Sequence, residues 1–389
     1  MPKTLRFICL ILLGIAVAGQ AAESVPGVRK MKDVIIYEDV KFFSAFPSVV
    51  KRPDGELLVA FRRAPNRKAL GEEKNNHVDP NSYLVLVRSR DGVTWTKQPE
   101  LIYAHALGGS QDPGLLQLRD GTMLCMSYGW TFLRPDGVPK LKPPFAQHYP
   151  GAYFNGGYYV RSVDGGKSWQ GPLYPPHIAS EILNDPYGQP VPAHNRGALV
   201  EGKDGRIFWV SASTDQDSPR KTSTHLLISK DQGLTWKYSC PVAVDAKVSF
   251  NETSIYETPQ GDLVTFLRTA NLNDEACIAR STDGGKSFQP WQGMGFQGHP
   301  LHALRLPDNR VLLTYGYRHP PFGIRARILN AECTDFATAS EIVLRDDGGT
   351  RDLGYPWSVQ LDAKHVLVTY YFNVGSGLQH IAGTILAID

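Results

Sequence analysis

Ionisable and phenolic side chains open several recurring β-like runs of this chain. They are Asp112, His194, Arg196, Glu252, His299 and Tyr355. Carboxylates and imidazoles transfer protons as general acids and bases, and a phenol becomes a nucleophile when a base accepts its proton. These residue types can therefore act on a bound substrate if the fold brings them into one pocket.

Arginines accompany the same runs. Those near the ends of the runs, or in the connections between them, are Arg62, Arg63, Arg268, Arg318, Arg325 and Arg327. A guanidinium group binds a planar anion through two parallel hydrogen bonds, so several arginines around one pocket indicate a carboxylate or sulfate ligand. We therefore expect an acidic small-molecule ligand.

The cysteines do not indicate metal or disulfide chemistry, because the chain has no CxxC pair and no cysteine at metal-ligand spacing from a histidine. The four that follow residue 22 are Cys125, Cys240, Cys277 and Cys333. We expect no cofactor and no disulfide framework. A metal site formed by His77, His194 and His299 stays open as an alternative.

A turn motif that occurs four times shows which elements position these residues. Its copies are RSRDGVTW at 88–95, RSVDGGKSW at 161–169, ISKDQGLTW at 228–236 and RSTDGGKSF at 280–288. Asp and Gly provide the hydrogen bonds and positive φ angles of a tight hairpin turn, and the last aromatic residue can fill the gap between two sheets. We expect these Asp boxes to be structural and not catalytic.

A second phrase, consisting of a strand, a polar turn and another strand, occurs six times. Its copies begin near residues 46, 112, 195, 251, 299 and 355. Six such units predict an all-β fold, a six-bladed β-propeller with four-stranded antiparallel blades. The run at 32–39 is expected to complete the last blade, and residues 130–155 to form a long loop over one face. The innermost strands begin around a central funnel, so the opening residues should share one pocket.

Composition and the N-terminus limit the class of protein. The 37 Gly and 28 Pro residues favour turns over long helices, and a net charge of +3 without basic runs argues against nucleic-acid binding. Residues 1–22 have the basic, apolar and small-residue order of a signal peptide, and their apolar run is short for a membrane span. We expect residues 23–389 to be one secreted or periplasmic domain.

The Asp boxes and strand openings together resemble the sialidase superfamily of glycoside hydrolases, over nearly the whole of residues 23–389. Glu252 is followed sixteen residues later by Arg268, and Tyr355 opens a last-blade segment about thirty residues after Arg325. The stretch HVDPNSY before the first Asp box is similar to the loop that holds the acid of the family, here Asp79.

This resemblance implies a retaining exo-α-sialidase mechanism with a tyrosine nucleophile. Tyr355 would attack the anomeric carbon, Glu252 would accept its proton, and Asp79 would protonate the leaving oxygen. A neutral phenol avoids the repulsion that the substrate carboxylate would exert on an anionic nucleophile. The resemblance implies that Arg268 and Arg325 hold that carboxylate, on a terminal acidic sugar of a glycan.

One departure from the family concerns the opening of the first blade. The family has an Arg-Ile-Pro phrase whose Arg is a third ligand of the carboxylate, and Ala45 stands in that place here. Either another cation compensates, or the ligand is a different acidic sugar. The candidates for a compensating cation are Arg62, Arg63 and Arg196.

Other interpretations remain open for the same residues. The chain could be a propeller that binds acidic glycans without cleaving them, or a lyase that uses a His/Tyr pair on another uronic-acid polysaccharide. His77, His194 and His299 could be substrate ligands, acid–base groups or rim residues of the funnel. Asp112 is expected to be a structural turn residue at the rim.

Overall fold

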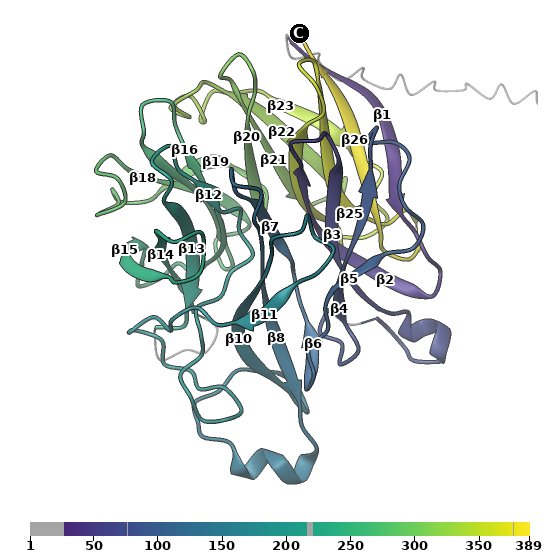
Figure 1. Ribbon diagram of the computed structural model, residues 1–389, viewed down its shortest axis with the longest axis vertical. Coiled ribbons are helices and arrows are strands. Elements are labelled where there is room, and N and C mark those ends of the chain that lie inside the picture. Colours follow the sequence, from purple (N-terminus) through teal and green to yellow (C-terminus); the bar gives the residue numbers. More distant parts are fainter. Residues whose placement is uncertain (1–26, 76, 216–220, 376) are drawn as a thin grey trace, which may run out of the picture.

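Six β-sheets form a ring around a central axis (Figure 1). The computed structural model describes residues 27–75, 77–215, 221–375 and 377–389. The leader expected at residues 1–22 lies outside these ranges. Neighbouring strands in every sheet are antiparallel, and each sheet supplies one blade. The predicted six-bladed all-β propeller is therefore confirmed.

The first three blades contain most of the N-terminal half of the chain. Blade one consists of β2 (Phe42–Lys51), β3 (Leu57–Pro65), β4 (Tyr83–Ser89) and β5 (Glu100–Tyr103). Blade two consists of β6 (Gly108–Ser110), β7 (Gly114–Gln117), β8 (Met123–Phe132), β9 (Gln147–Tyr149), β10 (Ala152–Ser162) and β11 (Gln170–Leu173). Blade three consists of β12 (Val200–Glu201), β13 (Ile207–Ser213), β14 (Ser223–Ser229) and β15 (Lys237–Ala243).

The other three blades close the ring. Blade four consists of β16 (Phe250–Glu257), β17 (Leu263–Thr269), β18 (Glu275–Ser281) and β19 (Gln292–Gln297). Blade five consists of β20 (Leu301–Arg305), β21 (Val311–Tyr317), β22 (Gly323–Leu329) and β23 (Glu341–Arg345). Blade six consists of β24 (Gly354–Gln360), β25 (His365–Phe372), β26 (His380–Ile388) and β1 (Val28–Tyr37). Two 3₁₀ turns are η1 (Arg67–Leu70) and η2 (Pro135–Lys140).

The N-terminal strand closes the ring as expected. β1 pairs with β26 in antiparallel register, with Val34 opposite Gly383. The run expected at 32–39 is thus the outermost strand of blade six, and it covers the backbone groups that an open edge of β26 would expose.

Blade two departs from the regular pattern. Both β6 and β7 pair with β8, so its innermost strand is interrupted at residues 111–113. The expected loop at 130–155 is shorter than predicted, because β8 and β10 pair as far as Phe132 and Ala152. The remaining loop contains η2 and β9, and the Tyr149 hydroxyl donates to the carbonyl oxygen of Val78 at 3.0 Å.

The Asp boxes form the turns between the third and fourth strands of blades one to four. In blade two, Asp164 Oδ1 accepts hydrogen bonds from the backbone N–H groups of Lys167 and Ser168, both at 3.0 Å. Trp169 then packs against residues of blades one and two. Hydrogen bonds from Ser168 and other turn donors lower the pKa of Asp164. The turns are structural, as their composition predicts.

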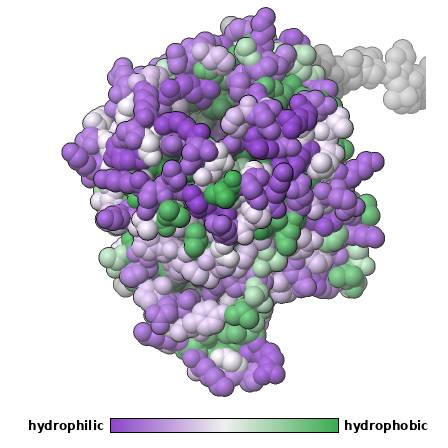
Figure 2. Space-filling model, viewed as in Figure 1, coloured by the Kyte–Doolittle hydropathy of each residue, from purple (hydrophilic) through white to green (hydrophobic). Residues whose placement is uncertain are grey.

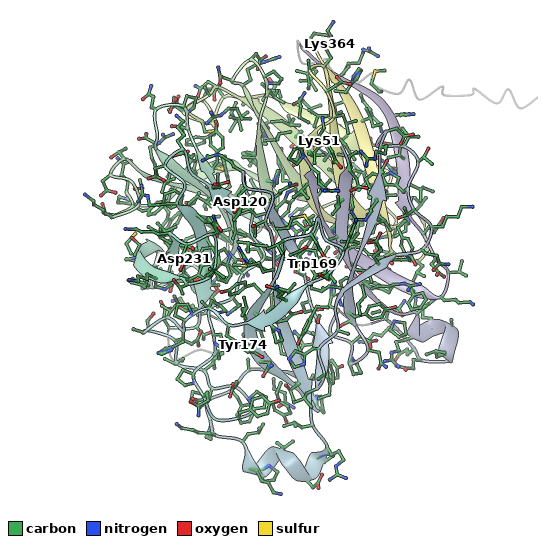
Figure 3. All side chains as sticks on the ribbon, in the orientation of Figure 1. Lys51, Asp120, Trp169, Tyr174, Asp231 and Lys364 are labelled. Atoms are coloured by element: carbon green, nitrogen blue, oxygen red, sulfur yellow. The ribbon has the colours of Figure 1, made fainter. Side chains whose placement is uncertain are left out.

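In an antiparallel meander the first and third strands run in the same direction and end at the same face. The turn after the first strand of each blade, which we call the first turn, therefore lies on the same face as the Asp boxes. Figure 3 labels Asp120 and Lys364 in first turns and Asp231 in an Asp box. The side of the molecule in Figure 2 carries mainly hydrophilic side chains, with hydrophobic ones scattered among them. Among the described residues, no helix is long and apolar enough to span a bilayer.

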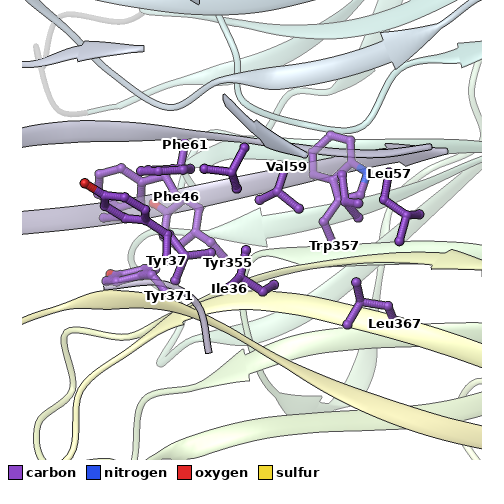
Figure 4. Packing of buried hydrophobic residues seen from close by; sticks show 14 of the residues in the cluster. Ile36, Tyr37, Phe46, Leu57, Val59, Phe61, Tyr355, Trp357, Leu367 and Tyr371 are labelled. Atoms are coloured by element: carbon purple, nitrogen blue, oxygen red, sulfur yellow. The ribbon is translucent and has the colours of Figure 1, made fainter. Parts of the chain in front are cut away.

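The hydrophobic core lies in the spaces between blades. The cluster in Figure 4 joins blades one and six, and there Tyr355 packs against Phe46 and Tyr371, with ring centroids 4.8 and 5.8 Å away. Cys125, Cys240, Cys277 and Cys333 are buried and free. The core therefore packs the start of β24 against the middle of β2.

Candidate active site

Tyr355, Glu252 and Arg268 form one hydrogen-bonded group between blades four and six. The Tyr355 hydroxyl donates to Glu252 Oε1 at 2.6 Å, and Arg268 Nη1 donates to the Tyr355 hydroxyl oxygen at 3.0 Å. Arg268 Nη1 also forms an ion pair with Glu252 Oε2. The structure thus brings together three of the residues predicted to form the site.

Irregular strand pairing occurs where Tyr355 and Glu252 lie. The pairing of β24 with β25 shifts between Gly354 and Trp357, and the pairing of β16 with β17 shifts between Phe250 and Thr253. Tyr355 adopts a left-handed backbone conformation with φ of 55°. Such a conformation costs roughly 1–3 kcal/mol in a residue with a side chain, and strained residues cluster at functional sites. The opening of β24 therefore marks Tyr355 as a candidate functional residue.

The pKa values of this group determine which of its members carries the proton at rest. Burial raises the pKa of Tyr355, and the charge of Glu252 raises it further. Burial would also raise the pKa of Glu252, but the charge of Arg268 and the hydrogen bond from Tyr355 leave it lowered. At neutral pH the phenol therefore keeps its proton and directs it at an ionised carboxylate.

Three guanidinium groups lie around the Tyr355 ring. The Cζ atom is 4.5 Å from the ring centroid in Arg196, 5.3 Å in Arg318 and 6.0 Å in Arg268. Arg196 is buried, and it donates to the carbonyl oxygen of Pro47. The site therefore holds three guanidinium groups beside the carboxylate of Glu252, although Ala45 stands where the resemblance implies an arginine.

Arg318 reaches the site from the connection between β21 and β22. Its Nε donates to the carbonyl oxygen of Leu353 at 2.9 Å, and its Nη2 donates to the Tyr371 hydroxyl at 2.8 Å. The sequence placed Arg318 among the funnel arginines without giving it a role. Its contact with the segment just before Tyr355 depends on tertiary structure.

Arg325 occupies a different place from the one predicted. Its guanidinium donates to the carbonyl oxygens of Arg345 and Pro321, and its Nε lies 3.4 Å from Glu341 Oε1. Glu341 and Arg345 belong to β23, the outermost strand of blade five, and Pro321 belongs to the connection before β22. The structure therefore does not bring Arg325 to Tyr355, because its side chain projects from β22 toward β23.

Arg62 and Arg63 project from opposite faces of β3, as neighbouring residues in a strand do. Arg62 is fully buried and pairs in register with Ala45. Arg63 binds Asp39 at 3.1 Å and the Tyr83 hydroxyl at 3.0 Å on the other face. Of these two candidates for a compensating cation, Arg62 lies beside Ala45 and Arg63 does not.

Asp79 is held by an arginine that the sequence did not single out. Arg67 donates Nε to Asp79 Oδ2 at 2.7 Å and Nη2 to Oδ1 at 2.8 Å. The backbone N–H of Asn81 donates to Oδ1 at 2.8 Å. Asp79 is buried, and all three donors lie in the same loop. Its predicted role as the acid stays a prediction, since no described contact joins it to Tyr355.

Asp112 lies in the interruption between β6 and β7 and is only 1% exposed. Its Oδ2 accepts a hydrogen bond from the Tyr128 hydroxyl at 3.1 Å, while its buried Oδ1 has no hydrogen-bond partner among the described residues. Burial and the charge of Glu252 raise its pKa to about 6, against the opposing charges of Arg196 and Arg62. The structure therefore makes Asp112 a buried acid inside the funnel, and not the rim turn residue that we expected.

The three candidate histidines lie apart. His77 is exposed, stacks on Phe46 at 5.5 Å and lies 3.0 Å from Asp352 Oδ1. His194 packs against Phe154 at 4.6 Å, and burial lowers its pKa to about 4. The described residues contain no group of three or more His, Cys, Asp or Glu side chains that could hold a metal ion.

His299 belongs to a separate polar group beside Arg268. Its Nε2 lies 3.1 Å from Asp274 Oδ1, and His319 Nε2 lies 3.1 Å from Asp274 Oδ2. Burial, followed by the charge of Arg268, lowers the pKa of His299 to about 4. The carboxylate of Asp274 therefore lies between His299 and His319, and His319 directly follows Arg318 in the chain.

A cavity of about 260 Å³ opens beside Glu252 and Arg196. Aromatic and apolar side chains from blade two form much of its wall, and hydroxyl and amide groups from blades three and four complete it. The lining residues are Tyr128, Trp130, Ala146, Phe154, Leu183, His194, Asn195, Arg196, Ala212, Thr214, Thr222, Ser249, Asn251 and Glu252. The cavity can therefore accept a group that is partly apolar and place it against Glu252 and Arg196.

Comparisons with known proteins agree with this architecture. Residues 145–368 match the family described as BNR repeat-like domain. A solved structure of a protein of unknown function from Dyadobacter fermentans DSM 18053 is 70% identical, covers 94% of this chain and 100% of that chain, and has a TM-score of 0.92. A search of curated proteins found no match.

Two solved sialidases have the same fold at low identity. The Hadza microbial sialidase Hz136 is 17% identical over 88% of this chain and 65% of its own, with a TM-score of 0.61. The Trypanosoma rangeli sialidase in complex with the inhibitor DANA is 16% identical over 92% of this chain and 58% of its own, with a TM-score of 0.60. The expected resemblance is confirmed in the fold, which the chain shares with these sialidases, and the chain belongs to the BNR repeat-like domain family.

Proposed function

We propose that this protein is a retaining exo-glycosidase of the sialidase type that hydrolyses a terminal acidic sugar, sialic acid or a related one, from a glycan. The observation that carries the proposal is the hydrogen-bonded group of Tyr355, Glu252 and Arg268. A tyrosine whose proton is directed at a buried carboxylate is an activated nucleophile. The leader expected at residues 1–22 suggests that the glycan is met outside the cytoplasm.

The charges around Tyr355 explain why the substrate would be acidic. Arg196, Arg268 and Arg318 surround the ring, and a substrate carboxylate beside them would be attracted strongly in a buried site. Tyr355, which is neutral before it attacks, would not repel that carboxylate. We therefore assign carboxylate binding to Arg268 and Arg318, and we retain Arg62, which pairs in register with Ala45, as a further candidate cation.

The reaction would proceed in two steps through a covalent intermediate. The Tyr355 oxygen would bond to the anomeric carbon while its proton passes to Glu252 and the leaving oxygen takes a proton from an acid. Water would then attack the anomeric carbon and give a proton back to that acid, the bond between the sugar and Tyr355 would break, and Tyr355 would recover its proton from Glu252. The anomeric configuration is retained because two displacements occur at the same carbon.

A fluorogenic sialoside assay tests this proposal. Tyr355→Phe should lower turnover by about 10³-fold or more, since loss of a nucleophile removes the covalent step. The matched control is Tyr256→Phe, which removes a buried hydroxyl that binds Arg305 and the carbonyl oxygen of Ala331. It should leave turnover unchanged.

Trapping the intermediate gives an independent readout. An acidic sugar fluorinated beside the anomeric carbon should leave a covalent adduct on Tyr355, detectable by peptide mass spectrometry. Unimpaired turnover in Tyr355→Phe, or an adduct on another residue, would refute the assigned nucleophile.

A second candidate is a propeller that binds an acidic glycan without cleaving it. The bonds between Asp79 and Arg67 favour it, because they occupy the carboxylate that the resemblance assigns as the acid. Calorimetric binding of a sialylated glycan, with no sugar released at any pH between 4 and 8, would support this candidate and exclude the hydrolase.

A further inference from the structure

We propose that His77 is a positioning residue, whose bond to Asp352 fixes the loop that carries Asp79 relative to the nucleophile Tyr355. This inference rests on the proposed glycosidase function, with Asp79 as the acid, and adds a residue for which the resemblance gives no role. The loop, which we call the acid loop, spans residues 66–82 between β3 and β4 of blade one.

The bonds between Arg67 and Asp79 do not place the acid loop relative to Tyr355. Both residues belong to the loop, as do Glu72 and Asn81, which also accept hydrogen bonds from Arg67. Bonds within one segment give the segment a shape, but they move with it. The distance between Asp79 and the nucleophile must therefore depend on contacts between the loop and other blades.

Blade two holds one side of the segment from His77 to Asp79. Gln111 Nε2 donates to the carbonyl oxygen of His77 at 2.7 Å, and the Tyr149 hydroxyl donates to that of Val78 at 3.0 Å. Because both acceptors are backbone groups, these bonds do not require an imidazole at position 77. A substitution of the His77 side chain therefore leaves the contact with blade two available.

The His77 side chain provides the contact with blade six. Its Nε2 lies 3.0 Å from Oδ1 of Asp352, which precedes Tyr355 by three residues at the start of this blade. A ring nitrogen that carries a proton donates in both the neutral and the charged imidazole, so the bond does not depend on the charge of His77. Among the described residues, this is the one polar side-chain contact between the segment 77–82 and blade six.

Asp352 is a firmly held partner for this bond. The Tyr371 hydroxyl donates to the same Oδ1 at 2.9 Å, and Gln379 Nε2 donates to Oδ2 at 2.8 Å. Burial would raise the pKa of Asp352, but the hydrogen bonds from His77 and Tyr371 and the charge of Arg318 leave it lowered. At neutral pH the carboxylate is therefore ionised, and an ionised acceptor strengthens the bond from His77.

One aromatic ring separates His77 from the nucleophile. The imidazole stacks on Phe46 with ring centroids 5.5 Å apart, and Phe46 packs against Tyr355 at 4.8 Å (Figure 4). The stack and the bond to Asp352 together fix the ring of His77, and Asp79 follows it by two residues. Because a misplacement of about 1 Å can cost roughly 10²-fold in rate, His77 acts through the position of the acid.

Sialosides with two kinds of leaving group test the proposal. An alkyl leaving group needs a proton from the acid, whereas an acidic phenol leaves without one. His77→Phe keeps an aromatic ring against Phe46 but removes the donor. It should lower kcat/KM about 10–10²-fold on the alkyl sialoside and far less on the aryl sialoside. His77→Gln keeps an N–H donor of similar reach and should retain most of the activity.

Thermal unfolding checks that these variants fold. His77 is exposed, so both variants should unfold at the temperature of the wild type. The matched control is His365→Phe, because His365 Nδ1 lies 2.8 Å from Asp362 Oδ2 on the opposite face of the ring of blades. It should leave the rates on both sialosides unchanged.

A double variant tests whether His77 and Asp352 act as a pair. Asp352→Asn should also slow the alkyl sialoside more than the aryl sialoside. Because the two residues act through one bond, the variant that combines His77→Phe with Asp352→Asn should be no slower than Asp352→Asn alone. Additive losses would show that the two side chains act independently and would overturn the proposal.

The remaining outcomes separate this inference from the proposed function. Equal losses on both sialosides in His77→Phe, or no loss on either, would overturn the positioning role while the glycosidase function stands. A wild-type protein that cleaves neither sialoside overturns the proposed function and this inference with it.

Discussion

The Asp-box turns and the funnel use the same residue type in opposite ways. Asp164 and Asp283 are exposed, each accepts several hydrogen bonds within its own turn, and these bonds lower the pKa of both. Asp112 is buried, accepts one hydrogen bond from Tyr128, and has a raised pKa. A short segment determines the first environment, whereas residues from several blades determine the second.

This difference distinguishes the repeated Asp-box turns from the strand openings, which hold the residues proposed for catalysis. The four Asp boxes have nearly the same local bonding because each turn satisfies itself. The six strand openings carry different residues, and those of blades one, three, four and six contact one another through Phe46, Arg196, Glu252 and Tyr355. Chemistry should therefore be sensitive to changes in the funnel and insensitive to changes in the turns.

The sharpest test of this comparison replaces one carboxylate in each region. Glu252→Gln should lower turnover of an acidic glycoside by about 10²–10⁴-fold, because an amide cannot accept the Tyr355 proton. Asp231→Asn, in the Asp box of blade three, should leave kcat and KM unchanged. Steady-state kinetics check both, and equal losses in the two variants would show that the funnel has no special role.

A smaller effect is expected from the arginines. Arg318→Ala should raise KM for an acidic substrate roughly 10–100-fold, since it removes one charge-assisted contact worth about 1.5–3 kcal/mol. Arg325→Ala should leave KM unchanged and lower only stability, because its partners are backbone carbonyls and Glu341. A raised KM in Arg325→Ala with an unchanged KM in Arg318→Ala would contradict this assignment and support Arg325 as the ligand of the substrate carboxylate.

The smallest effect is a pH dependence of stability with opposite signs in the two regions. The raised pKa of Asp112 means that its contribution is present at low pH and is lost as pH rises toward about 6. The lowered pKa of Asp283 means that its contribution is present at neutral pH and is lost as pH falls below about 4.

Urea unfolding between pH 3 and 8 measures these dependences. The free energy of unfolding of Asp112→Asn relative to wild type should rise with pH, and that of Asp283→Asn should fall. Slopes of the same sign would contradict the contrast between the two environments.

Much of the fold could be predicted because its signals are local. The Asp-box turns need only Asp, Gly and Ser at fixed spacing, and six strand phrases imply six blades. The strand at Val28–Tyr37 was predictable as well, because it had no blade of its own. The extent of the loop in blade two was not, since it depends on how far β8 and β10 continue to pair.

The candidate site could be predicted only in part. Tyr355, Glu252 and Arg268 share a recognisable spacing, and the structure joins them. Arg318 and Arg325 are seven residues apart in one segment, and the sequence did not show which of them reaches Tyr355. The direction in which β22 presents its side chains decides that question.

The sequence by itself determined the blade count, the closing strand and the turns, because each depends on residue type and short-range order, and its resemblance to a known family supplied the nucleophile candidate. Only the tertiary structure decided the partners of each charge. It paired Asp79 with Arg67, left one oxygen of Asp112 without a hydrogen-bond partner among the described residues, and set Arg318 beside Tyr355. The physical reason is that burial and electrostatic interaction depend on distance in space, and closing the ring brings together residues that lie far apart in the chain.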